Sequence, residues 1–166
     1  MDYIRHIGSP LGPLTLASDG ESLTGLWFDG QKHYGMTLAE EREEKDLRVF
    51  RETEAWLRLY FSGEAPDFTP LLLLRGTDFR RRIWQLLLAV PYGETVSYGE
   101  LARRAAGDAP AAFRCARAVG GAVGRNPISI LVPCHRVLAA DGSLCGYAGG
   151  AERKRALLRL EGIEIP

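Results

Sequence analysis

Features of membrane-bound and secreted proteins are scarce in this chain of 166 residues. It has only three cysteines, Cys115, Cys134 and Cys145, with no C-x-x-C pair among them. An odd number of cysteines cannot be fully paired within one chain, so we expect free thiols, a reducing compartment and a cytoplasmic location. No apolar run approaches the roughly 20 residues of a membrane helix, and the first residues lack the apolar core of a signal peptide. We therefore expect neither a membrane partner nor a disulfide framework.

Motifs for metals and cofactors are also missing. His6 and His33 have no cysteine near them in the sequence. Neither a P-loop nor a G-x-G-x-x-G after an expected strand occurs. The sequence therefore predicts a protein with no metal and no cofactor.

The net charge is zero, which at first argues against a nucleic-acid partner. The two halves differ, however. Residues 1–74 hold 7 basic and 13 acidic residues, a net charge of −6, whereas residues 75–166 hold 14 and 8, a net charge of +6. This asymmetry favours a chain that meets phosphate with one face only. Arginines that merely solvate a surface would explain the charge equally well.

The first half has the pattern of a small antiparallel sheet followed by a helix. Three stretches separated by turn chemistry are expected strands: residues 3–8, 14–18 and 23–28. Residues 47–61 carry apolar side chains at helical spacing. The polar residues 31–45 indicate a solvated loop or helix surface, and the apolar residues 71–74 a strand or part of an interdomain connection.

The second half is expected to be mostly helical. Thr77 or Asp78 can cap the first helix, and Ser97 can cap the second with Glu100 completing a capping box. The second and third helices, joined by a short turn at residues 107–110, form a helix-turn-helix candidate. The expected helices are residues 78–89, 98–106, 111–123 and 151–160.

The third of these helices is unusually rich in small residues. Gly120 and Gly121 are adjacent, and a glycine inside a helix costs about 1 kcal/mol relative to alanine. Close packing against another helix would explain the pair. Close approach to a DNA backbone would explain it equally well.

The segment I-S-I-L-V-P-C-H-R-V at residues 128–137 organises the chain. Its apolar, β-branched start predicts a buried strand-like segment, which Pro133 ends. Cys134 therefore lies at an abrupt turn beside a base, His135, and a permanent cation, Arg136. Such neighbours favour the nucleophilic thiolate. A buried cysteine is more often inert packing, so the pair alone does not decide.

Several further motifs accompany this segment at fixed distances. R-A-V-G-G-A and G-R-N-P precede it, and G-Y-A-G-G and L-E-G follow it, ending at Gly162. With P-C-H-R-V, this ordered set closely resembles the O6-alkylguanine-DNA alkyltransferases. The resemblance is densest over residues 77–162, and looser in the N-terminal part, mainly at S-P-L-G-P-L-T-L.

The resemblance implies an α+β fold of two domains. Residues 1–74 would form a three-stranded antiparallel sheet with a helix, ribonuclease-H-like, and residues 75–166 a mostly helical domain with the helix-turn-helix. The implied function is stoichiometric transfer of an alkyl group to a cysteine, from O6-alkylguanine and O4-alkylthymine in double-stranded DNA. The base would be flipped through the minor groove by a monomer. Some members carry an N-terminal zinc site, but no cysteine precedes Cys115 here, so we expect no zinc.

Four residues match the family's catalytic positions. Cys134 would accept the alkyl group, and His135 would take the thiol proton in a relay through water to Glu161 of L-E-G. Asn126 matches the asparagine that braces the active-site turn. Turn chemistry alone would also account for Asn126, and a loop position for Glu161.

DNA and substrate contacts are implied in the same way. Tyr98 matches the tyrosine that strains the neighbouring phosphate and helps hold the guanine, and Arg117 matches the arginine finger that replaces the extruded base. Ala118 and Gly121 lie on the same DNA-contacting helix. The remaining substrate-binding residues are Val137, through its carbonyl, and Tyr147 and Ala148 of the pocket loop.

Three departures from the family pattern stand out. Ala148 replaces the usual serine, although the backbone N–H thought to contact O6 remains. The stretch between Tyr98 and Arg117 is a few residues longer than expected, and Cys145 is a thiol beside the pocket loop.

Two rival functions are a lesion-binding protein without repair and a cysteine hydrolase. The first class lacks the acceptor cysteine present here, and hydrolases rarely use a histidine adjacent in sequence.

Overall fold

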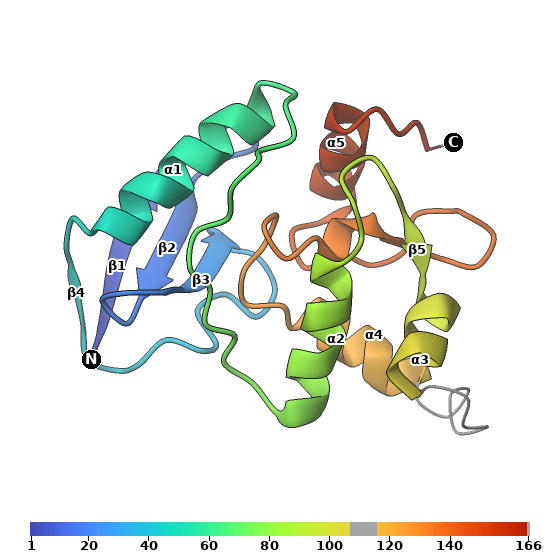
Figure 1. Ribbon diagram of the computed structural model, residues 1–166, viewed down its shortest axis with the longest axis horizontal. Coiled ribbons are helices and arrows are strands. Elements are labelled where there is room, and N and C mark those ends of the chain that lie inside the picture. The colour runs from blue at the N-terminus through green and yellow to red at the C-terminus, as the bar shows by residue number, and fades with distance from the viewer. Residues whose placement is uncertain (107–115, 166) are drawn as a thin grey trace. The chain divides into compact units, whose positions relative to one another are not determined.

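A computed structural model describes residues 1–106 and 116–165 (Figure 1). It contains two compact units. The first comprises Met1–Arg75 with Pro127–Leu131, and the second comprises Gly76–Asn126 with Val132–Pro166. In the part of the chain that the structure describes, no helix is both long and apolar enough to cross a membrane.

The first unit is built on the predicted antiparallel meander of β1 (Asp2–Ile7), β2 (Leu14–Ser18) and β3 (Leu23–Phe28). β1 pairs with β2 from Tyr3↔Ser18 to Ile7↔Leu14, and Leu14 pairs with Phe28 of β3. Every residue of β2 and β3 is buried, so both faces of these strands are covered. The predicted helix is α1 (Arg48–Phe61), which runs along the sheet with Phe50, Trp56 and Tyr60 among its buried side chains (Figure 1).

A fourth strand contradicts the prediction of a loop or helix surface over residues 31–45. β4 (Arg42–Glu44) pairs in parallel with β1, which gives the sheet order β3-β2-β1-β4. All three of its residues are exposed, so no apolar alternation marks it in the sequence. Charged side chains on an edge strand also disfavour pairing with another chain.

The segment before Pro133 is buried, as predicted, but it is barely a strand. Ile128 forms a single parallel bridge with Leu26, through hydrogen bonds of 2.8 Å on either side of Leu26. The chain then turns at Ile130, which has a φ of 71°. A positive φ is unfavourable for a β-branched residue, so this turn is held by the burial of its neighbours. Leu72 likewise makes one bridge, to Leu23.

The second unit is mostly helical, as predicted. Thr77 Oγ1 caps the first helix by accepting from Arg80 N at 3.2 Å, and Ser97 Oγ caps the second by accepting from Glu100 N at 3.1 Å. The helices are α2 (Asp78–Leu88), α3 (Tyr98–Ala106), α4 (Ala116–Gly124) and α5 (Ala151–Leu160). The predicted turn at 107–110, the predicted helix start at Ala111 and Cys115 lie outside the described residues.

The core of this unit brings α2, α3 and α4 together. Trp84 of α2 is 1% exposed, and its Nε1 donates to Ala122 O of α4 at 2.8 Å. A short parallel pair that the sequence did not indicate, β5 (Val96–Ser97) with β6 (Val137–Leu138), leads the chain out of the cysteine turn. Other fully buried core residues are Ile83, Leu87, Leu101, Val119, Leu157 and Leu158.

Candidate active site

Cys134 begins a single 3-10 turn, Cys134–Arg136, directly after Pro133. Its N–H donates to Val132 O at 2.8 Å, and Arg136 N donates to Pro133 O at 3.0 Å. The cysteine is only 4% exposed, and this burial raises the pKa of its thiol. The resting sulfur is therefore protonated at neutral pH, and reaction requires groups that favour the thiolate.

Asn126 is one such group. It follows α4, and its Nδ2 donates both to Val132 O at 2.8 Å and to Cys134 Sγ at 3.2 Å. The first bond ties the asparagine to the backbone two residues before the cysteine. The second favours the charged sulfur and opposes the effect of burial on the Cys134 pKa. One side chain thus holds the turn and stabilises a thiolate.

His135 and Glu161 form a buried pair. His135 Nε2 lies 2.6 Å from Glu161 Oε2, and both side chains are excluded from solvent. Glu161 is the C-cap of α5, and it also accepts from Gly93 N at 3.0 Å. The two side chains are in direct contact, so any water of the expected relay must lie on the thiol side of His135.

Arg136 supplies the positive charge that Glu161 requires. Its Nε donates to Glu161 Oε1 at 2.8 Å and its Nη2 to Oε2 at 3.2 Å, while Nη1 donates to Val90 O at 2.7 Å. This fork fixes the carboxylate in place. It also compensates for the unfavourable position of an acid at the C-terminal end of a helix.

The protonation states follow from these contacts. Burial would raise the pKa of Glu161, but the hydrogen bond from His135, the charge that His135 carries at acid pH, and hydrogen bonds from Arg136 and Gly93 N–H outweigh it and lower the pKa to about 2. Burial lowers the pKa of His135 and outweighs the hydrogen bond and charge of Glu161, which would raise it, while Arg136 and Lys154 act in the same direction as burial. We therefore assign an ionised Glu161 and a neutral His135. Nε2–H of His135 then donates to the carboxylate, and Nδ1 is the ring nitrogen that can be protonated.

Lys154 is a site residue that the sequence analysis missed. It is 0% exposed, and its Nζ donates to Val137 O at 2.6 Å, to Cys145 O at 3.2 Å and to Gly146 O at 3.4 Å. Burial lowers its pKa, while Cys145 and Cys134 oppose that effect. The ammonium thus links β6 to the pocket loop and contributes positive charge near the Cys134 sulfur.

The spacing on α5 contained a signal for this lysine. Lys154 precedes Leu157 and Leu158 by three and four residues, and these two leucines are the other buried residues of the helix. Two other apolar residues of this helix, Ala156 and Leu160, are only half-buried. Lys154 lies in the charged sequence A-E-R-K-R-A, which is typical of a solvated helix surface. Only its spacing from Leu157 and Leu158 indicates that its side chain is buried.

The pocket loop lies next to the first residue of α3. Tyr98 Oη is 3.5 Å from Gly146 O, and burial raises the pKa of the Tyr98 phenol, with further contributions from Cys145 and Cys134. Tyr147 and Ala148 are half-buried in the same loop. The structure therefore brings Tyr98 and the loop together in the second unit. The carbonyl of Val137, the other expected substrate contact, already accepts from Lys154.

Three of the predicted DNA contacts, Arg117, Ala118 and Gly121, lie on α4, and the fourth, Tyr98, begins α3. Arg117 and Ala118 are exposed and Gly121 is half-buried. A Cβ at Gly121 would approach Arg125 Nη1 at 3.3 Å, whereas a Cβ at Gly120 would meet no described residue within 4 Å. Packing against the described helices therefore does not account for Gly120, and Gly121 leaves space for the Arg125 guanidinium.

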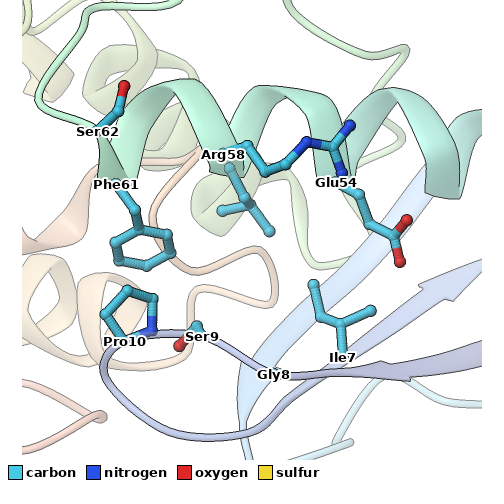
Figure 2. Close-up of a pocket in the computed structure, with 9 residues that line it drawn as sticks. Ile7, Gly8, Ser9, Pro10, Glu54, Arg58, Phe61 and Ser62 are labelled. Atoms are coloured by element: carbon cyan, nitrogen blue, oxygen red, sulfur yellow. The ribbon is translucent and has the colours of Figure 1, made fainter.

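A cavity of about 550 Å³ in the first unit contains none of the predicted site residues. It lies between α1 and the turn after β1, where the rings of Phe61 and Pro10 lie opposite each other (Figure 2). Its acidic residue, Glu54, already accepts from Arg5 Nε at 2.8 Å. This cavity has no group suited to the cysteine chemistry.

Both parts of the chain match models of one protein class. Residues 3–74 match the ribonuclease-like domain of 6-O-methylguanine DNA methyltransferase, and residues 78–163 match its DNA binding domain. These are proteins in which a ribonuclease-like domain accompanies a DNA-binding domain. The chain belongs to the 6-O-methylguanine DNA methyltransferase family.

Individual relatives agree over nearly the whole length. The methylated-DNA–protein-cysteine methyltransferase of Mycobacterium tuberculosis is 49% identical over 166 residues, covering 100% of this chain and 96% of the relative. The Haemophilus influenzae protein of the same name is 43% identical, covering 97% and 87%. A crystal structure of M. tuberculosis OGT in complex with DNA superimposes with a TM-score of 0.84 at 48% identity, covering 99% of this chain and 95% of that one.

Proposed function

We propose that this chain repairs alkylated duplex DNA by moving the alkyl group from O6 of guanine to Sγ of Cys134. The family supports this reaction, and one observation carries it: Asn126 Nδ2 lies 3.2 Å from the Cys134 sulfur, in a turn that also holds the His135–Glu161 pair. O4-alkylthymine is proposed as a second substrate. The protein would act as a monomer, in the cytoplasm, without a cofactor.

The proposed reaction starts with removal of the thiol proton. Nδ1 of His135 receives it through a water molecule, and ionised Glu161 stabilises the imidazolium that forms. The thiolate, stabilised by Asn126 and Lys154, attacks the alkyl carbon. The C–S bond forms as the C–O6 bond breaks, and the electron pair stays on guanine. Guanine then takes up one proton, so the thiol hydrogen is exchanged for the alkyl group.

The other expected contacts are proposed as follows. Arg117 fills the place of the base flipped out through the minor groove, and Ala118 and Gly121 allow close approach of α4 to DNA. Tyr98, kept protonated by its raised pKa, holds the guanine together with the pocket loop at Tyr147 and Ala148.

Substrate contact through Val137 is also retained as a proposal. Its carbonyl keeps a second lone pair for the guanine amino group beside the bond from Lys154.

Residues 1–74 and 75–166 are proposed as the functional domains. The compact units differ from these domains in one short segment. Residues 127–131 lie in the second domain by sequence but belong to the first compact unit.

Intact-mass spectrometry tests the reaction. After incubation with an excess of duplex containing O6-methylguanine, each chain should carry one methyl group and no more. The product is a stable thioether, so the acceptor thiol is not regenerated for a second transfer. A lesion-binding protein would retain its original mass. A cysteine hydrolase would instead turn over model esters repeatedly. Either outcome would contradict the proposed repair reaction.

A further inference from the structure

A cleft lined by three arginines lies between α2 and α4. It has a volume of about 490 Å³, and the cations around it are Arg80, Arg117 and Arg125. Its remaining wall includes the small residues Ala118, Gly121 and Ala122. We call this feature the arginine cleft. Of the residues that line this cleft, Arg117, Ala118 and Gly121 are already proposed as contacts to DNA.

The walls of the arginine cleft are held by buried contacts. Arg80 lies four residues before Trp84 on α2, so the two side chains leave the same face of the helix. Trp84 is buried and donates to Ala122 O of α4 at 2.8 Å. The position of Arg80 relative to α4 is therefore set by the core of the second unit.

The arginines of α4 are also arranged by spacing. Arg117, Gly121 and Arg125 follow one another at intervals of four residues and so fall on one side of the helix and its continuation. Arg125 Nη1 donates to Gly121 O at 3.2 Å, which fixes its guanidinium over the glycine. A Cβ at position 121 would press against that nitrogen at 3.3 Å.

The arginine cleft has strong positive charge without an internal counter-charge. Among the described residues that line it, none carries a carboxylate. The neighbouring Asp78 instead pairs with Arg81. Within the described part of the chain, none of the three arginines of the cleft forms an ion pair. Guanidinium groups stay charged at any physiological pH, and their fork of N–H donors matches a phosphate.

We propose that the arginine cleft binds a phosphodiester of duplex DNA, with Arg80 and Arg125 donating to its oxygens beside Arg117. This proposal rests on DNA as the substrate. It adds α2 to the DNA-binding surface and separates two tasks among the arginines. Arg80 and Arg125 hold the strand regardless of sequence or damage, whereas Arg117 acts on the flipped base.

The test is the salt dependence of binding to unmodified duplex. Each lost phosphate contact should reduce the slope of log K against log salt by about 0.9. The parent protein should lose affinity when the salt is raised from 50 to 200 mM. The factor by which affinity falls should be about 3-fold to 4-fold smaller in Arg80→Gln and in Arg125→Gln, and about 12-fold smaller in the double variant. Lysine at either position should keep most of the slope, because it keeps the charge.

Arg159→Gln is the matched control, because this arginine lies on α5 of the same unit with its side chain 62% exposed and outside the cleft. It should bind like the parent protein. Wild-type affinity and slope in both glutamine variants would overturn the proposal, as would an equal loss of slope in the control. Methyl transfer by the parent protein is measured separately. Its failure would refute the repair function without affecting the binding test, which needs no lesion.

Discussion

Replacing Glu161 by glutamine should weaken both the fold and the reaction. The side chain is excluded from solvent and bonds to His135 and to the fork of Arg136. Glutamine keeps the shape but leaves Arg136 as a buried cation without a counter-charge. Removing one partner of a buried ion pair typically costs about 3–5 kcal/mol. A domain of ordinary stability, about 5–15 kcal/mol, would remain folded but would lose much of its margin.

The pKa of Glu161 gives a second figure for the same interaction. Lowering the pKa from 4.5 to about 2 corresponds to at most about 3 kcal/mol of stability. Because the folded pKa is the lower one, this stability is present above pH 4.5 and is lost as the pH falls toward about 2. The glutamine variant should lack that acid transition. Both figures predict that the loss of stability at neutral pH is about 3 kcal/mol or somewhat more.

Chemical denaturation at neutral pH measures the effect on stability. Glu152→Gln, an exposed acid on the same helix, is the control and should change the free energy of unfolding by less than about 0.5 kcal/mol. Combining Glu161→Gln with Arg136→Met should recover part of the loss, because no buried charge is then left unpaired. The single-turnover rate of Glu161→Gln should fall about tenfold or more, since His135 loses the anion that stabilises its protonated form. Unchanged stability together with an unchanged rate would refute this reasoning.

Three further predictions concern residues around the sulfur and on α4. Asn126→Ala should shift the pH–rate profile of transfer to higher pH, because the thiolate loses the donor 3.2 Å away; a profile that only scales down would show a purely structural role. Lys154→Met should shift the profile in the same direction, because the Cys134 thiolate loses a nearby cation; an unshifted profile would contradict that role. Arg117→Ala should slow repair of methylated duplex at saturation about tenfold or more, yet spare reaction with free O6-benzylguanine, which needs no flipping. Equal losses with both substrates would contradict a role in flipping.

The predictable parts of the fold are those in which burial leaves a periodic pattern. α1 has apolar side chains at helical spacing, β2 and β3 are short segments bounded by turn sequences, and the caps Thr77 and Ser97 follow from side-chain chemistry. β4 is an exposed edge strand whose pairing depends on the backbone of β1, so no local pattern marks it. Ile130 looked like part of a strand, but its positive φ depends on how the surrounding segment is buried.

The candidate site shows the same division. The Cys134 motif pointed to the nucleophile, and the resemblance pointed to Asn126 and Glu161, but neither indicated that Asn126 contacts the sulfur itself or that Arg136 braces Glu161. Those contacts depend on segments far apart in the sequence. Lys154 was missed because a lysine is usually solvated, and only the position of the buried stripe on α5 reveals it.

Peptide mapping after reaction with O6-methylguanine duplex tests the central claim most directly. One methyl group should be found on the peptide containing Cys134, in the parent protein and in the control variant Cys145→Ser. Cys134→Ser should carry none while still binding DNA. A methyl group on Cys115 or Cys145, or continued methylation of Cys134→Ser, would contradict the assignment of Cys134 as the acceptor.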